Sequence, residues 1–174
     1  FDSTVSVEDV WSGRYGKGVD NLFIQLIPAA YENSVFTADR DGRMLAMSAE
    51  NGDEIWTERN KAWRISGGPG VGDGLVFTGT SDAEVIARDA ETGEEKWVAL
   101  VSSEVLAAPV SSGGTVVVRT GDGKLFGLDA ETGNRKWIYD RTIPVLTLRG
   151  TSAPVIHGSV VIAGFDNGRL VALD

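Results

Sequence analysis

AMSAENGDEIW (residues 46–56), ARDAETGEEKW (87–97) and GLDAETGNRKW (127–137) are three copies of one pattern, and each copy ends in a tryptophan. Trp56, Trp97 and Trp137 are spaced by 41 and 40 residues. The same step separates a glycine and a proline of each copy: Gly52, Gly93 and Gly133, and Pro28, Pro69 and Pro109, with Pro154 following after 45 residues. Self-similarity at a fixed period of this length indicates a repeat architecture.

Each copy has the pattern of short β-strands joined by tight turns. The stretches VFTADRDGRMLAMSA, TVVVRTGDGKLFGLDA and VVIAGFDNGRLVALD place a turn dipeptide between two strand-like runs. The dipeptides Asp41-Gly42, Asp122-Gly123 and Asn167-Gly168 supply the positive φ angles that a tight hairpin turn requires. The second copy has Asp82-Ala83 instead, so we expect its turn to differ in type or length. A second glycine, at positions 52, 93 and 133, allows the turn before the tryptophan strand.

A period near 41 residues with several strands and no helical periodicity predicts a β-propeller. Other repeats of similar length are mostly helical and would place apolar residues at i, i+3 and i+4. Here they alternate or run together, as in residues 115–118, which suits a strand covered on both faces. The predicted fold class is all-β, with four-stranded antiparallel blades. Because Trp56, Trp97 and Trp137 recur at a fixed phase, we interpret them as packing between blades rather than as a ligand platform.

The first and last copies are incomplete in this sequence. Trp11 resembles the end of a copy whose beginning is absent, and the copy that begins at Ala153 stops at Asp174, before the expected turn and tryptophan. We divide the chain into an outer strand of a closing blade (1–18), three blades (19–60, 61–101 and 102–141) and an incomplete blade (142–174). Such an open array leaves two apolar end faces, so we expect the isolated segment to pair with another copy or to be marginally stable.

Composition excludes several classes of function. The net charge is −9, and Lys and Arg are scattered rather than gathered into a cationic stripe, which argues against nucleic acid as a partner. The chain has no Cys, which excludes disulfides, Cys-ligated zinc and a thiol nucleophile. No run approaches the ~18 apolar residues of a membrane span. The chain begins Phe1-Asp2-Ser3 without a signal-peptide pattern, so we expect any targeting signal to have been removed or to lie outside this sequence.

Three motifs suggest chemistry but are better explained by structure. The glycine-rich run 67–74 lacks the Lys and the following helix of a phosphate loop, and we interpret it as a turn region. Residues 39–42 lack the remaining ligands of a calcium loop and are interpreted as a hairpin turn. His157, the only histidine, matches no nucleophile pattern with Ser152 or Ser159 and is expected in an exposed turn. We therefore predict no catalytic residue, no cofactor and no metal.

Residues 140–150 do not fit the repeat, because they fall in the interval that measures 45 residues rather than 40 or 41. In an extended conformation Leu146 and Leu148 share one side, and Arg149 follows as a long donor. Two aliphatic anchors beside an Arg suit a protein-binding surface. The alternative is an inner strand with ordinary core leucines, and the pattern by itself leaves both readings open.

The chain resembles two groups of known proteins. The copies, with endings of the form A-x-[ST]-G-x-x-x-W, resemble the quinoprotein-type (PQQ-like) propeller repeat. PAAYENSVFTADRDGRMLAMSAENGDEIW (28–56), TLRGTSAPV (147–155) and FDNGRLVAL (165–173) resemble the BamB family of outer-membrane assembly lipoproteins of Gram-negative bacteria. The resemblance covers nearly the whole chain. Its most specific part is L-T-L-R-G-x-S-A-P, because the repeat endings are shared by many propellers.

The BamB resemblance implies a scaffold rather than an enzyme. It implies an eight-bladed propeller, of which this chain is about half, on the periplasmic side of the outer membrane. Its partner would be the POTRA domains of BamA, and unfolded outer-membrane proteins would be its clients. The family's L-x-L-R contact carries over to Leu146, Leu148 and Arg149. A second, acidic contact loop would lie beyond Asp174, and the lipid-bearing Cys is absent from this sequence, so anchoring rests on the family alone.

Two alternative functions use the same repeat. A PQQ-dependent quinoprotein dehydrogenase needs a PQQ pocket and a calcium ion, and many such enzymes have an adjacent Cys pair. This chain has no Cys and no recognisable ligand set. The other alternative is a sensor or ligand-binding propeller that uses the central channel.

Overall fold

The computed structural model describes residues 7–16, 24, 26–140 and 151–174, and these residues contain fifteen β-strands and no helix. The first sheet has the order β1 (Ala29–Tyr31), β2 (Ser34–Ala38), β3 (Arg43–Ser48) and β4 (Glu54–Arg59). The second has β5 (Ile65–Gly72), β6 (Leu75–Thr80), β7 (Glu84–Asp89) and β8 (Glu95–Leu100). The third has β9 (Val110–Ser112), β10 (Thr115–Arg119), β11 (Leu125–Asp129) and β12 (Arg135–Tyr139). The fourth has β13 (Val155–His157), β14 (Val160–Gly164) and β15 (Leu170–Leu173).

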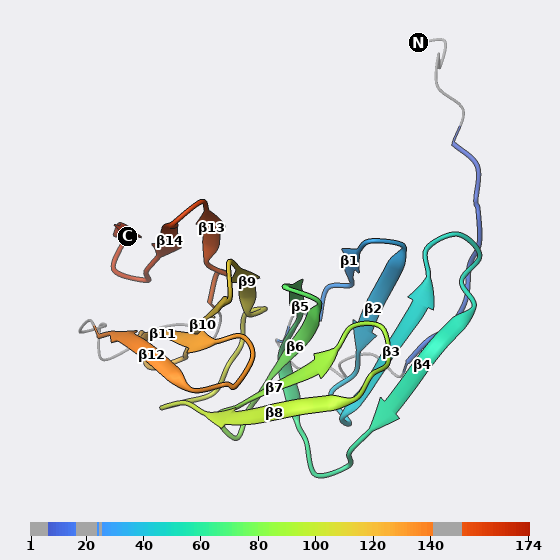
Figure 1. Ribbon diagram of the computed structural model, residues 1–174, viewed down its shortest axis with the longest axis horizontal. Helices are drawn as coiled ribbons and strands as arrows, with labels where there is room; N and C mark the ends of the chain where they lie inside the picture. Colours follow the sequence, from blue (N-terminus) through green and yellow to red (C-terminus); the bar gives the residue numbers. More distant parts are fainter. Residues whose placement is uncertain (1–6, 17–23, 25, 141–150) are drawn as a thin grey trace.

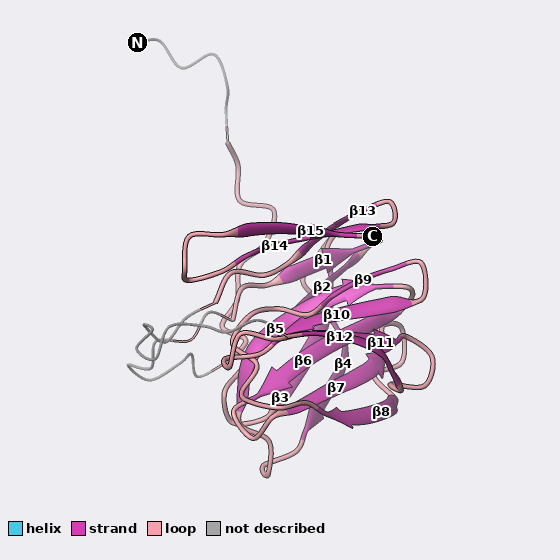
Figure 2. Ribbon diagram, turned by 90° about the vertical axis from the view of Figure 1, so that its left-hand side faces the viewer, coloured by secondary structure: helices cyan, strands magenta, loops and turns pink. Residues whose placement is uncertain are grey.

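The four sheets stand side by side around a common centre, which confirms the predicted partial β-propeller (Figure 1). Every pair of neighbouring strands is antiparallel, and the spatial order follows the chain. The first strands lie at the centre, where β1 contacts β5, β5 contacts β9 and β9 contacts β13. The strands that carry tryptophan, β4, β8 and β12, lie at the outside, and Figure 2 shows the same all-strand architecture from the side.

The hydrophobic core consists of layers between neighbouring sheets. Phe36, Trp56, Ile65 and Ile86 pack between the first and second sheets. A second cluster joins sheets two and three, and a third cluster joins sheets three and four. Residues 116–118 are completely buried, and they alternate between the second and third clusters. This explains the continuous apolar run, because a blade with a neighbour on each side has no solvent-facing surface.

The hairpin turns between second and third strands have the same length in all four sheets, with a positive φ at the equivalent residue. Gly42, Gly123 and Gly168 have φ of 79°, 84° and 78°. The turn of the second copy has the same length, because Ala83 takes the same place with φ of 63°, so our expectation of a different length is wrong. In the other three turns only the glycine of each dipeptide has a positive φ. The turns before the tryptophan strands follow the prediction, with φ of 72–76° at the glycines 52, 93 and 133.

The glycine-rich run 67–74 is mostly strand, which corrects its interpretation as a turn region. Residues 67–72 belong to β5, and only Asp73 and Gly74 form the turn to β6. The glycines are needed for close packing, because a Cβ on Gly70 would collide with the carbonyl oxygen of Pro109. The run therefore allows the backbone of the second sheet to approach that of the third near the centre of the array.

Candidate partner-binding surface

The predicted partner-binding residues Leu146, Leu148 and Arg149 lie outside the described residues. The chain is described up to Asp140, which follows β12, and again from Thr151, which precedes β13. We call Asp140 and its neighbours before the gap, and Thr151 and Ser152 after it, the two flanks of the segment. Both flanks lie beside the turn that joins β10 to β11, which we call the anchoring turn (residues 119–124).

Arg119, the last residue of β10, holds the flank at Ser152. Its side chain is only 2% exposed, and Nη1 donates to Ser152 Oγ at 2.9 Å and to Ser152 O at 3.4 Å. Its Nη2 lies 3.5 Å from Asp166 Oδ1, and the guanidinium lies 5.1 Å from the ring centre of Phe165. Burial lowers the pKa of Arg119, and the charge of Asp166 acts in the opposite direction. One side chain thus joins the third sheet, the fourth sheet and the flank.

Lys124, on the other side of the anchoring turn, lies near the flank at Asp140. Its Nζ lies 3.0 Å from Asp122 Oδ2 and 3.9 Å from Asp140 Oδ2. Asp122 also accepts hydrogen bonds from Thr120 Oγ1 at 2.6 Å and from Ser102 Oγ at 3.0 Å. Burial acts to raise the pKa of Asp122, but the hydrogen bonds and the Lys124 charge outweigh burial, so that the pKa is lowered.

Arg119 was missed in the sequence, although the repeat contains a signal for it. The corresponding positions of the other copies are Ala38, Gly79 and Gly164, all small residues. Because the other copies fold with Ala or Gly at this position, the Arg is not required by the repeat and indicates an additional role. The position also ends a completely buried apolar run, where an Arg is costly unless it is paired.

The repeated tryptophans lie between sheets. Trp56 Nε1 donates to Ala90 O at 3.0 Å, and Trp97 Nε1 donates to Ala130 O at 2.8 Å. Each indole lies against the glycine of the next sheet's turn, where a Cβ would come within 2.7 Å of the ring. Trp11 makes the same contact, with Nε1 2.9 Å from Ala49 O. Trp137 is half-buried and packs against the cluster between the third and fourth sheets.

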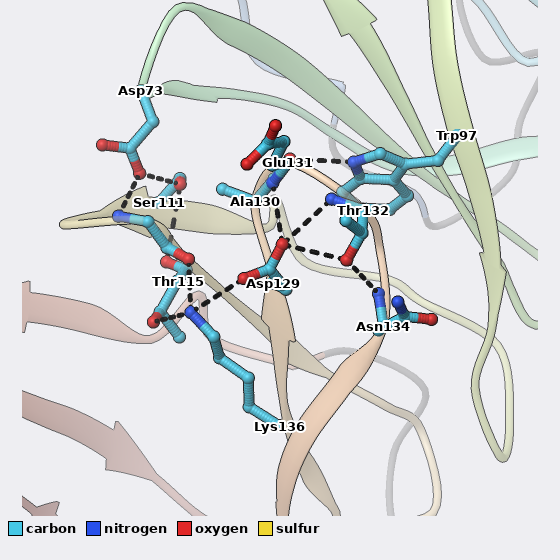
Figure 3. A network of polar contacts seen from close by, with 11 residues as sticks. Asp73, Trp97, Ser111, Thr115, Asp129, Ala130, Glu131, Thr132, Asn134 and Lys136 are labelled. Carbon is cyan, nitrogen blue, oxygen red and sulfur yellow. Dashed lines mark hydrogen bonds and ion pairs between the residues drawn. The ribbon is translucent and has the colours of Figure 1, made fainter.

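A polar network links the turns of the second and third sheets (Figure 3). The carboxylate of Asp73 accepts from Ser111 Oγ at 2.6 Å and from Gly114 N at 3.1 Å. Lys136 Nζ donates to Gly114 O at 2.8 Å and lies 3.1 Å from Asp129 Oδ2. Hydrogen bonds from Lys136, then from Thr132, lower the pKa of Asp129. The Asp73 contacts join the second sheet to the third, whereas the contacts of Lys136 and Asp129 lie within the third sheet.

The two other motifs, at residues 39–42 and at His157, lie in a turn and at a strand end. The carboxylate of Asp39 accepts from the backbone N of Asp41 at 3.0 Å and of Arg43 at 3.2 Å, which closes its own turn. His157 is exposed at the end of β13. In the described part of the chain, no three His, Asp or Glu side chains are grouped so that they could hold a metal ion. The same residues contain no helix that is long and apolar enough to cross a membrane.

Comparison with known proteins identifies the relatives of this chain. The family model described as outer membrane protein assembly factor BamB matches residues 40–174. The assembly factor BamB of Pseudomonas aeruginosa is 48% identical over 174 residues, which are all of this chain and 46% of that protein. BamB of Alkalilimnicola ehrlichii is 52% identical over 170 residues, which are 98% of this chain and 44% of that protein. The chain thus spans less than half the length of these relatives.

One similar solved structure belongs to the same group, and two others share the fold. The crystal structure of BamB from Moraxella catarrhalis has a TM-score of 0.80 at 31% identity, covering 88% of this chain and 46% of that one. The computationally designed Ika4 protein has a TM-score of 0.69 at 18% identity, covering 93% of this chain and 98% of that one. A quinohemoprotein alcohol dehydrogenase from Pseudomonas putida has a TM-score of 0.63 at 19% identity, covering 79% of this chain and 28% of that one. The last two likenesses concern the fold alone.

Proposed function

Because the chain belongs to the family of the outer membrane protein assembly factor BamB, we propose that it acts as a non-catalytic scaffold subunit of the outer-membrane β-barrel assembly machinery. The observation that carries the proposal is 48% identity to a named assembly factor along the whole chain. The proposal concerns the part of such a subunit that these 174 residues supply.

The partner that we propose is BamA, bound through its POTRA domains. Leu146 and Leu148 would enter an apolar recess of the partner, and Arg149 would make charge-assisted hydrogen bonds at its rim. The L-x-L-R pattern of the sequence supports this assignment.

The scaffold would work on the periplasmic side of the outer membrane, with unfolded outer-membrane proteins as its clients and a lipid anchor in the full-length protein. The rigid sheets would set the orientation of the contact segment relative to BamA. No step in this role makes or breaks a covalent bond, so its success is measured by binding and by assembly of client proteins.

The proposal is tested with the variant Leu146→Ala, Leu148→Ala, Arg149→Ala and isolated POTRA domains of BamA. We expect the affinity, measured by calorimetry, to fall by about tenfold or more, since apolar anchors beside an Arg dominate such interfaces. The matched control is Leu100→Ala, an exposed leucine on the outer strand β8 that should leave binding unchanged. Circular dichroism checks that both variants fold. Undiminished binding of the triple variant would remove these residues from the interface.

A further inference from the structure

The segment that leads from β4 to β5 presents cations to solvent, and we call it the cationic loop (residues 59–64). Its three cations, Arg59, Lys61 and Arg64, are all exposed. Within the residues that the structure describes, none of the three forms an ion pair, whereas the exposed lysines of β8 and β12, Lys96 and Lys136, both do. The loop therefore offers three cations to a ligand of opposite charge.

The backbone of the cationic loop is fixed by its contacts with the first sheet. Trp63, between two of the cations, is 8% exposed and packs in the core layer between the first and second sheets. The guanidinium of Arg88 lies 5.2 Å from the centre of a Trp63 ring. The backbone N of Trp63 donates to Asn60 O at 3.0 Å, and Asn60 N donates to Gly42 O at 3.0 Å. The fold thus sets the positions from which the cations project.

The repeat does not require these cations. At the position of Arg59, counted from the repeat tryptophan, the second and third copies have Leu100 and Asp140. At the position of Arg64, counted from the repeat proline, the second copy has Glu104. Leu100 is 76% exposed although its sheet packs against a neighbour on each side, so exposure at this position is a property of the complete blade.

Arg64 also corresponds to a residue of the predicted contact segment. It lies five positions before the repeat proline Pro69, and Arg149 lies five positions before Pro154. The connections between successive sheets therefore have an Arg at the same repeat position in the first and third cases. Arg149 is the Arg for which the L-x-L-R pattern predicts a partner contact, so the equivalent Arg64 is a candidate for the same kind of contact.

The cationic loop and the two flanks lie on one rim of the array. Ser81 N, in the turn between β6 and β7, donates to Arg64 O at 2.9 Å, and the corresponding anchoring turn lies beside both flanks. Because the strands are antiparallel, the turns between third and fourth strands lie at the opposite rim. Those turns, at 49–53, 90–94 and 130–134, contain acidic residues and neither Lys nor Arg. A partner bound at the first rim therefore meets a charge distribution that the second rim lacks.

We propose that the cationic loop is a second contact for the partner of Leu146, Leu148 and Arg149, and that it binds an acidic surface of that protein. The inference rests on the proposed function, because it extends the proposed BamA interface along the same rim. Arg side chains recognise carboxylates by paired, charge-assisted hydrogen bonds, and exposed cations accelerate encounter with an acidic partner. An anionic lipid surface fits less well, because it would repel a chain of net charge −9, whereas a protein can place carboxylates opposite the loop alone.

The variant Arg59→Glu, Lys61→Glu, Arg64→Glu of the 174-residue chain tests this contact with the POTRA domains of BamA. We expect its association rate constant at low ionic strength, measured by stopped flow, to be about tenfold or more below that of the wild type. The dissociation rate constant should change less, since exposed charges act mainly on encounter. About 1 M salt should remove most of the difference, because it shortens the screening length to about 3 Å.

A matched pair of single variants controls for the change in net charge. Arg64→Glu and Arg135→Glu alter the charge equally at exposed residues, but Arg135 begins β12 beside the opposite rim. We expect Arg64→Glu to slow association by about threefold or more and Arg135→Glu to leave the rate unchanged. Circular dichroism and urea denaturation check that both variants fold as the wild type does.

The possible outcomes separate this inference from the proposed function. If the wild type binds and the triple Glu variant associates equally fast at low ionic strength, the second contact is wrong and the proposed function stands. If the wild type does not bind the POTRA domains, both are wrong. Binding of the wild type to phosphatidylglycerol vesicles that the triple Glu variant loses, with unchanged binding to BamA, would assign the loop to lipid and overturn the inference.

Discussion

Ala83 has a backbone conformation that L-residues other than glycine rarely adopt, with φ of 63°. The three equivalent positions are Gly42, Gly123 and Gly168. The turn forms nevertheless, because Thr80 Oγ1 accepts hydrogen bonds from the backbone N of Asp82 and of Glu84, as Asp39 Oδ1 does in the first sheet. The side-chain oxygen of Thr80 therefore stabilises the turn, and the positive φ of Ala83 costs about 1–2 kcal/mol.

We predict that Ala83→Gly raises the free energy of unfolding by roughly 0.5–1 kcal/mol, since relief of the strain exceeds the added flexibility of the unfolded chain. Urea denaturation followed by tryptophan fluorescence measures the change. The reverse substitution, Gly123→Ala, should lower the free energy of unfolding by a similar amount. If Ala83→Gly is destabilising, the conformation of this turn is not strained.

The anchoring turn between β10 and β11 shows how one element can organise its surroundings. Arg119 contacts Ser152, which precedes the fourth sheet, and Lys124 lies near Asp140, which follows the third sheet. Asp122 is the centre of this arrangement, with Thr120, Ser102 and Lys124 around its carboxylate. The pKa of Asp122 is lowered, so the ionised form is favoured in the folded protein.

We predict that Asp122→Asn lowers the free energy of unfolding near neutral pH by about 1 kcal/mol or less, because the group is partly screened by solvent. A carboxyl with a lowered pKa stabilises the fold above its ordinary pKa, and this contribution is lost as the pH falls below about 4. The difference between wild type and variant should therefore shrink with acid, as measured by urea denaturation at a series of pH values. A difference that stays constant would show that the charge of Asp122 has no part in stability.

The whole molecule is a one-dimensional array in which each sheet is stabilised by its neighbours. Its core is divided into layers between sheets, and the tryptophan contacts cross each junction. A sheet inside such an array has two covered faces, and an end sheet has one. The same contact therefore contributes more to the free energy of unfolding in the middle of the array than at its end.

We predict that Trp97→Ala lowers the free energy of unfolding by about 3–5 kcal/mol, because a buried indole and its hydrogen bond to Ala130 are lost. Trp11→Ala removes a half-buried indole at the end of the array and should cost less than half as much. Both are compared in one urea series at a single protein concentration. Equal losses would mean that the junctions do not differ in strength.

Much of the fold was predictable because the repeat samples each structural position several times. The phase of the tryptophans and of glycines 52, 93 and 133 indicated strands and turns that the structure confirms. The length of the turn at Ala83 was not predictable from its dipeptide, because the oxygen of Thr80 before the turn accepts the hydrogen bonds that Asp39 accepts in the first sheet. Leu146, Leu148 and Arg149 remain a prediction from the sequence pattern.

The sequence by itself determined the strand periodicity, the sheet order and the family, because local turn chemistry and the alternation of side chains depend on neighbours in the chain. Tertiary structure alone decided that residues 67–72 form a strand and that Arg119 joins two sheets to Ser152. It likewise decided that Trp11, which the repeat already indicated as the end of a copy, contacts Ala49. The contacts of Arg119 and Trp11 join residues that are 33 or more positions apart and meet only when the sheets pack.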